Sequence, residues 1–158
     1  MRDSSLSAAQ QAVLAAEVGH LELAYDYWAE TTFTDLYNLH GNSVQGLHLA
    51  ALAGGWTVAV CGFGGMRDHS GWVTFAPRLP PKLSCLAFRI LVEGRAITVK
   101  VNRDSATYHL IDGADFTSSH HGQEFTIGVD RPVTLPIPDA PNVEPVHQPK
   151  GREPIHRD

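Results

Sequence analysis

The spacing of apolar residues changes once along this chain, from a helical period to an alternation of two. Up to about residue 62 the apolar side chains recur every three or four positions, as when Leu21, Tyr25 and Trp28 line one face of a helix. From Trp72 onward apolar and polar residues alternate, which is the pattern of half-buried strands. We therefore predict an α+β fold in which helices come first and strands follow.

Within these two regions we expect long helices and several short strands. The predicted elements are helices over 8–16, 21–37 and 47–60, and strands over 86–92, 97–101, 107–111 and 124–129. Short strands at close spacing indicate a small antiparallel sandwich, with a hairpin turn at Glu93-Gly94. Beyond Arg131 the frequent prolines should prevent sheet pairing and favour an extended strap or a loose tail.

Composition excludes several classes of protein. The 158 residues are 43% hydrophobic, which suffices for one ordinary core, and the net charge of −5 argues against partners such as nucleic acid or a membrane surface. Cys61 and Cys85 lie in apolar runs and are predicted to be small buried side chains in a reducing compartment. The first residues lack the pattern of a secretory signal, so we expect a cytoplasmic location.

The loop before the third helix is a candidate anion site, because it feeds the positive end of a helix. Gly41 and Gly46 have the separation of a phosphate-binding loop, but Leu47-His48 replaces the Lys-Ser/Thr that a nucleotide needs. An ordinary loop held by Asn42 or Ser43 explains the same pattern equally well. His48 could touch a ligand at this site or be a core histidine.

Other polar residues have simpler explanations. His120-His121 is expected in an exposed turn, since adjacent strand residues point to opposite faces and do not easily share a metal ion. The helical carboxylates fit a solvated face without an acid or base role. They are Glu17, Glu22, Asp26, Glu30 and Asp35.

Six stretches carry a more specific signal. They are DSSLS at 3–7, GHLELAYDY at 19–27, HGNSVQGLHLA at 40–50, AGGW at 53–56, GFGGMR at 62–67 and FAPRLP at 75–80. In this order and spacing they resemble the C-terminal part of glycoside hydrolase family 65. That family contains maltose, trehalose and kojibiose phosphorylases and related α-glucoside hydrolases.

The resemblance implies a larger architecture of which this chain is the end. Residues 1–68 would be the last helices of the (α/α)6 catalytic barrel, 69–136 a C-terminal antiparallel β-sandwich, and 137–158 a Pro-rich tail. It also implies an inverting reaction, in which a Glu protonates the glycosidic oxygen while phosphate or water attacks from the opposite face. Neither that Glu nor the family's Lys-Gln pair is found here, so no catalytic residue is assigned and activity of this chain stays open.

The resemblance also implies a site. Asn42, Ser43, Gln45 and Gly46 correspond to the family's phosphate loop, and Asp3, Ser4 and His48 to the substrate pocket. Inorganic phosphate would be a co-substrate, and no cofactor or metal is expected. Gln45 departs from the His or acidic residue of other members, and a neutral amide cannot serve as a general base.

Two hypotheses follow. In the first, the chain is the C-terminal portion of an α-glucoside phosphorylase or hydrolase, inactive alone, whose partners are a disaccharide or sugar phosphate and either the missing N-terminal catalytic portion or a second copy. In the second, it is a stand-alone, non-catalytic β-sandwich module that binds carbohydrate or protein.

Overall fold

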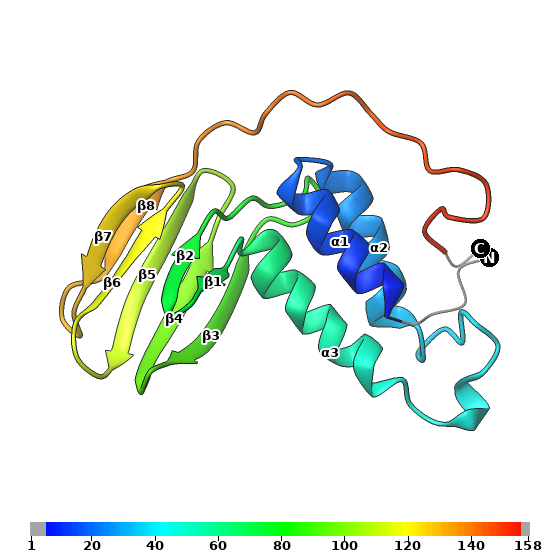
Figure 1. Ribbon diagram of the computed structural model, residues 1–158, viewed down its shortest axis with the longest axis horizontal. Helices are drawn as coiled ribbons and strands as arrows, with labels where there is room; N and C mark the ends of the chain where they lie inside the picture. Colours follow the sequence, from blue (N-terminus) through cyan, green and yellow to red (C-terminus); the bar gives the residue numbers. More distant parts are fainter. Residues whose placement is uncertain (1–5, 156–158) are drawn as a thin grey trace. The chain divides into compact units, whose positions relative to one another are not determined.

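A computed structural model describes residues 6–155 of the chain (Figure 1). The chain forms two compact units: one contains the residues up to 62 together with those from 141 onward, and the other contains residues 63–140. Helices make up the first unit and strands the second, so the predicted α+β class is confirmed. The division falls at 62/63, and the Pro-rich end of the chain belongs to the helical unit.

Three helices and two short turns of helix form the helical unit. They are α1 (Ser7–Glu17), α2 (Leu21–Phe33), the 3-10 turn η1 (Ser43–Gln45), α3 (Leu49–Thr57) and the π-helical η2 (Val58–Phe63). Small side chains let the helices approach closely: a Cβ on Gly54 of α3 would lie only 2.7 Å from the Cβ of Ala9 on α1. No helix in the described range is long and apolar enough to cross a membrane.

The helix predicted over 21–37 is shorter than expected, because α2 ends at Phe33. Asp35 and Asn38 follow, and both side chains bond to backbone groups of the loop ahead of α3. Short polar side chains of this kind compete with the helical hydrogen-bond pattern and favour turns. Asn38 accordingly adopts a left-handed conformation with φ 49°.

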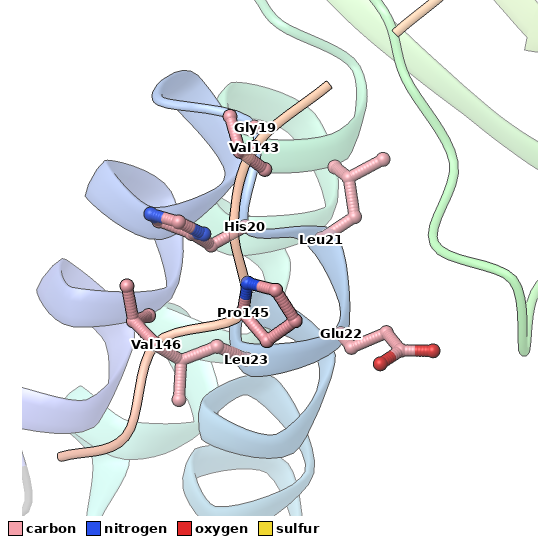
Figure 2. Close-up of a pocket in the computed structure, with 8 residues that line it drawn as sticks. All are labelled: Gly19, His20, Leu21, Glu22, Leu23, Val143, Pro145 and Val146. Atoms are coloured by element: carbon pink, nitrogen blue, oxygen red, sulfur yellow. The ribbon is translucent and has the colours of Figure 1, made fainter. Parts of the chain in front are cut away.

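Residues 141–155, here called the C-terminal strap, are anchored on α2 of the same unit. The hydroxyl of Tyr27 donates to the carbonyl of Arg152 at 2.7 Å, and the amide of Ile155 donates to the carboxylate of Glu30 at 2.9 Å. Nearer its start, the strap passes Gly19–Leu23 and borders a cavity of about 250 Å³ (Figure 2). Of the two predicted alternatives, the strap is therefore the one observed.

Two four-stranded sheets form the other unit. One has the order β1-β2-β6-β7 and the other β3-β4-β5-β8. Their strands are β1 (Arg67–His69), β2 (Trp72–Phe75), β3 (Leu86–Val92), β4 (Arg95–Val101), β5 (Ser105–Asp112), β6 (Phe116–His120), β7 (Gln123–Ile127) and β8 (Val133–Pro136). The predicted turn at Glu93-Gly94 joins β3 to β4, with positive φ at both residues.

The sheet unit differs from prediction in three respects. The pairing is not wholly antiparallel, because β2 and β6 run parallel. The prolines beyond Arg131 do not prevent pairing: β8 ends at Pro136 and lies at a sheet edge, where a missing amide is tolerated. Cys85 is exposed and not a buried side chain, since it precedes β3 in a turn-rich segment.

Tyr108 of β5 connects the two sheets. Its ring is fully buried and contacts Phe75 of β2 and Phe125 of β7, which belong to the opposite sheet. Its hydroxyl lies 2.7 Å from Nδ1 of His120, and Nε2 of His120 lies 2.9 Å from the carbonyl of Pro136. Since a carbonyl only accepts, Nε2 carries the proton and the tyrosine hydroxyl donates to Nδ1. His120 is thus a core residue at 2% exposure, and the expectation of an exposed turn is wrong for it.

The two adjacent histidines should make the sheet unit sensitive to acid. Burial lowers the pKa of His120, and burial together with the charges of His120 and Arg78 lowers the pKa of His121 to about 4 from an ordinary 6.5. The unfolded chain therefore binds more protons below pH 6.5, and stability present above that value is lost as the pH falls toward 4. Because His121 keeps some solvent contact, we expect a loss of about 1–2 kcal/mol.

Thermal unfolding followed by circular dichroism across this pH range measures the effect. His121→Gln retains a donor for the carbonyl of Pro77, which the His121 ring contacts at 3.2 Å, and should flatten the pH dependence. The same change at exposed His109 is the matched control and should leave the pH dependence unaltered. A His121→Gln profile identical to that of the unaltered chain would contradict the assignment.

Candidate functional site

The predicted anion loop is organised around the carboxylate of Asp35. Its Oδ2 accepts the backbone amide of His48 at 2.7 Å, and its Oδ1 lies 2.5 Å from Nδ1 of the same residue. The Asp35 side chain is 8% exposed and that of His48 is 20% exposed. His48 is therefore neither a core histidine nor a freely solvated one, because a buried carboxylate holds both its backbone and its ring.

This contact fixes the charge of Asp35. Hydrogen bonds from the His48 ring and then from the His48 amide lower the pKa of Asp35, against the opposing effect of desolvation. The carboxylate consequently stays ionised at neutral pH. Its expected role as part of a solvated helix face is wrong: the residue lies beyond the end of α2 and is largely covered.

Ser43 completes the loop from the other side. Its amide donates to the side-chain oxygen of Asn38 at 3.0 Å, and its hydroxyl donates to the carbonyl of Asp35 at 3.3 Å. The amides of Gln45 and Gly46 donate to the carbonyls of Asn42 and Ser43 within η1. The loop amides are thus largely engaged, and side chains together with the His48 ring are the groups left to meet a ligand.

The structure brings some of the predicted site residues together. Asn42 and Ser43 are partly buried near the Asp35–His48 pair, whereas Gln45 and Gly46 are exposed on the same loop. The side-chain oxygen of Asn42 is buried without a hydrogen-bond partner in the described part of the chain. The other two predicted pocket residues, Asp3 and Ser4, lie outside the described residues.

The residue that sequence reasoning missed is Asp35. The available signal was the pair of turn-forming residues Asp35 and Asn38 inside a supposed helix, which indicates an earlier helix end. Even so, no local pattern connects Asp35 to His48, thirteen positions later. A second missed carboxylate is Glu30, which is 2% exposed and bonded to the C-terminal strap, so the expectation of a solvated face is wrong there too.

Known families account for most of the chain. Residues 1–57 match the model of the glycosyl hydrolase family 65 central catalytic domain, and residues 66–127 match that of the glycosyl hydrolase family 65 C-terminal domain. The candidate loop lies in the first match, and most of the paired strands lie in the second.

Individual relatives agree with these matches. An uncharacterized glycosyl hydrolase of Mycobacterium tuberculosis is 48% identical over 99% of this chain and 20% of its own length. The α,α-trehalose phosphorylase of Geobacillus stearothermophilus is 35% identical over 84% of this chain and 17% of its own length. The chain thus spans about a fifth of the length of these relatives.

A solved structure has the same fold. The chain superimposes with a TM-score of 0.78 on a protein assigned as a kojibiose phosphorylase from the human microbiome, at 22% identity and over 84% of this chain and 18% of the other. The two family models match in the order catalytic domain, then C-terminal domain, and the named relatives agree with them. The chain therefore belongs to glycosyl hydrolase family 65 and corresponds to the C-terminal part of its members.

Proposed function

We propose that this chain is the C-terminal portion of an inverting α-glucoside phosphorylase or hydrolase that acts on a glucose disaccharide such as trehalose, maltose or kojibiose. The observation that carries the proposal is the match of residues 1–57 to the family's catalytic domain, in the segment where Asp35 holds His48. Relatives named as trehalose, kojibiose and maltose phosphorylases support the substrate class. In this proposal α1–α3 are the last helices of the (α/α)6 barrel, and the two sheets are the C-terminal β-sandwich.

The loop formed by Asn42, Ser43, Gln45 and Gly46, with His48, is proposed as the phosphate side of the active site. The Ser43 hydroxyl and the partly exposed His48 ring supply polar contacts. The acid that protonates the leaving oxygen would come from another part of the enzyme. Inorganic phosphate is then a co-substrate and water its hydrolytic alternative.

Exposed apolar side chains on the helical unit support the proposal that a partner covers this surface. Large apolar side chains are exposed on α3 and in the loop ahead of it, at Leu36, Val44, Leu47, Leu49 and Trp56. Large apolar side chains exposed in such number along one segment favour an interface over a free surface. We propose that the rest of the catalytic barrel, or a second copy of the chain, covers it.

We expect the purified chain alone to show neither phosphorolysis nor hydrolysis of trehalose, maltose or kojibiose. Combined with the preceding portion of the Geobacillus stearothermophilus trehalose phosphorylase, it should restore turnover, and the dependence on added phosphate separates phosphorolysis from hydrolysis. The matched control is the preceding portion without this chain. Robust turnover by the chain alone would contradict the proposal that it is one part of an enzyme.

The phosphate loop has its own test in the chain by itself. Inorganic phosphate at millimolar concentration should shift the amide resonances of residues 42–48 in a ¹⁵N-labelled sample, and Ser43→Ala should weaken that response. Glu22→Gln, an exposed change on α2, serves as the control. Shifts spread evenly over the surface, or none within the loop, would contradict a phosphate site there.

Oligomeric state distinguishes the stand-alone module from the fragment. Because the apolar side chains of α3 are uncovered, we expect the isolated chain to self-associate in size-exclusion chromatography. A monodisperse monomer would instead favour the non-catalytic module that binds carbohydrate or protein.

A further inference from the structure

We propose that Asp35 is a positioning residue that fixes His48 in the tautomer with the proton on Nδ1, so that Nε2 accepts a proton from an O–H group of bound dihydrogen phosphate. This inference rests on the proposed phosphate side of the site. It gives a role to a carboxylate outside the predicted loop and defines which nitrogen of His48 meets the ligand.

The tautomer follows from the chemistry of the contact. An ionised carboxylate has no proton to donate, so the ring nitrogen 2.5 Å from Asp35 Oδ1 must be the donor. In a neutral imidazole the remaining nitrogen, Nε2, then carries the lone pair. The second oxygen of Asp35 binds the His48 amide at 2.7 Å, which fixes the backbone from which the ring extends.

Burial determines which member of the pair meets a ligand. The carboxylate is 8% exposed and the imidazole 20% exposed, so the pair presents the ring and withholds the anion. The backbone of Asp35 is also held, because the Ser43 hydroxyl donates to the main-chain carbonyl of Asp35. Asp35 thereby connects Ser43 and His48, two residues of the proposed phosphate side of the site.

The charge balance suits an anion that carries a proton. A buried carboxylate behind a neutral ring would repel a fully ionised anion. When dihydrogen phosphate gives a proton to Nε2, one O–H bond breaks, an N–H bond forms, and the ligand becomes hydrogen phosphate with one more negative charge. The pair becomes an imidazolium held by a carboxylate, which faces the more anionic phosphate with a positive ring. Sulfate carries no proton at neutral pH and cannot make this exchange.

Nitrogen-15 spectra of the imidazole rings in the full chain test the inference. We expect His48 to be protonated at Nδ1 and unprotonated at Nε2, and phosphate but not sulfate to shift Nε2 toward the protonated form. Asp35→Asn should give a mixture of tautomers and weaken the phosphate response by about tenfold, as for other residues that orient a ligating histidine. Asp35→Glu should recover part of the response, and Glu22→Gln should leave it unchanged.

The outcomes separate this inference from the proposed function. Protonation of His48 at Nε2 in the unaltered chain, or an Asp35→Asn spectrum like that of the unaltered chain, would overturn the positioning role whether or not phosphate binds. Phosphate shifts at the amides of 42–46 without a change at Nε2 would overturn the inference and leave the phosphate site standing. No phosphate response at either place would overturn both.

Discussion

Replacement of Gly65 by alanine should destabilise the sheet unit by about 3 kcal/mol. Gly65 has φ +61°, and a Cβ at this position would overlap the backbone carbonyl of Ala76 and lie 2.8 Å from the Ala76 nitrogen. Backbone atoms cannot rotate away as a flexible side chain can. The chain must therefore separate at the place where the Ala76 amide donates to the Gly65 carbonyl at 3.1 Å and the Arg78 amide to that of Phe63 at 2.9 Å.

The estimate combines two costs. A residue other than glycine in the left-handed region costs about 1 kcal/mol, and each backbone hydrogen bond that is broken and left imperfectly replaced costs about 1 kcal/mol or more. Gly94→Ala is the matched control, because Gly94 has φ +77° but no atom within 4 Å of the added Cβ. Gly94→Ala should therefore be destabilised only by the cost of the left-handed conformation.

Hydrogen exchange of the amides in β4 and β5 reports the stability of this unit, since these are the inner strands of one of its two sheets. We expect exchange to accelerate strongly in Gly65→Ala and only slightly in Gly94→Ala. Equal acceleration in the two variants would show that conformational strain alone, and not the approach of Ala76, explains the glycine.

The parts of the fold that the sequence predicted well are those governed by neighbouring residues. Ile97, Val99 and Val101 alternate with polar residues, and all three prove fully buried on β4. The turn at Glu93-Gly94 follows from the glycine, which adopts positive φ without a steric cost. In each case the cause lies within a few positions of the effect, so a local pattern is sufficient.

The parts that could not be predicted depend on contacts between distant residues. His120 looked like a turn residue, but its two ring nitrogens are satisfied by Tyr108 and Pro136, which places it in the core. Asp35 and Glu30 looked solvated because their partners lie 13 and 125 positions away. For the candidate site, the loop was predicted and the carboxylate beneath it was not.

Glu30→Ala should destabilise the helical unit by about 3 kcal/mol, although Ala is the better helix former. The Glu30 carboxylate is 2% exposed and accepts the Ile155 amide at 2.9 Å, three residues beyond the carbonyl that Tyr27 binds. Hydrogen bonds to buried charged groups contribute more than neutral ones, and the loss of the side chain also leaves a space under the strap. Glu22→Ala, on the exposed side of the same helix, should cost less than about 1 kcal/mol.

A chain that ends at residue 150 tests whether the contact with the strap is the reason why Glu30→Ala destabilises the helical unit. It lacks the carbonyl of Arg152 and the amide of Ile155, so Glu30→Ala should cost at least about 1.5 kcal/mol less in this background than in the full chain. Hydrogen exchange of the α2 amides measures the cost of Glu30→Ala in the full chain and in the shortened chain. Equal costs in the two backgrounds would mean that Glu30 stabilises the helices without the strap. Both of these hydrogen bonds reach the strap's backbone, so they do not depend on which side chains stand at positions 152 and 155. Glu30 and Tyr27, one helical turn apart, define where the strap attaches on α2.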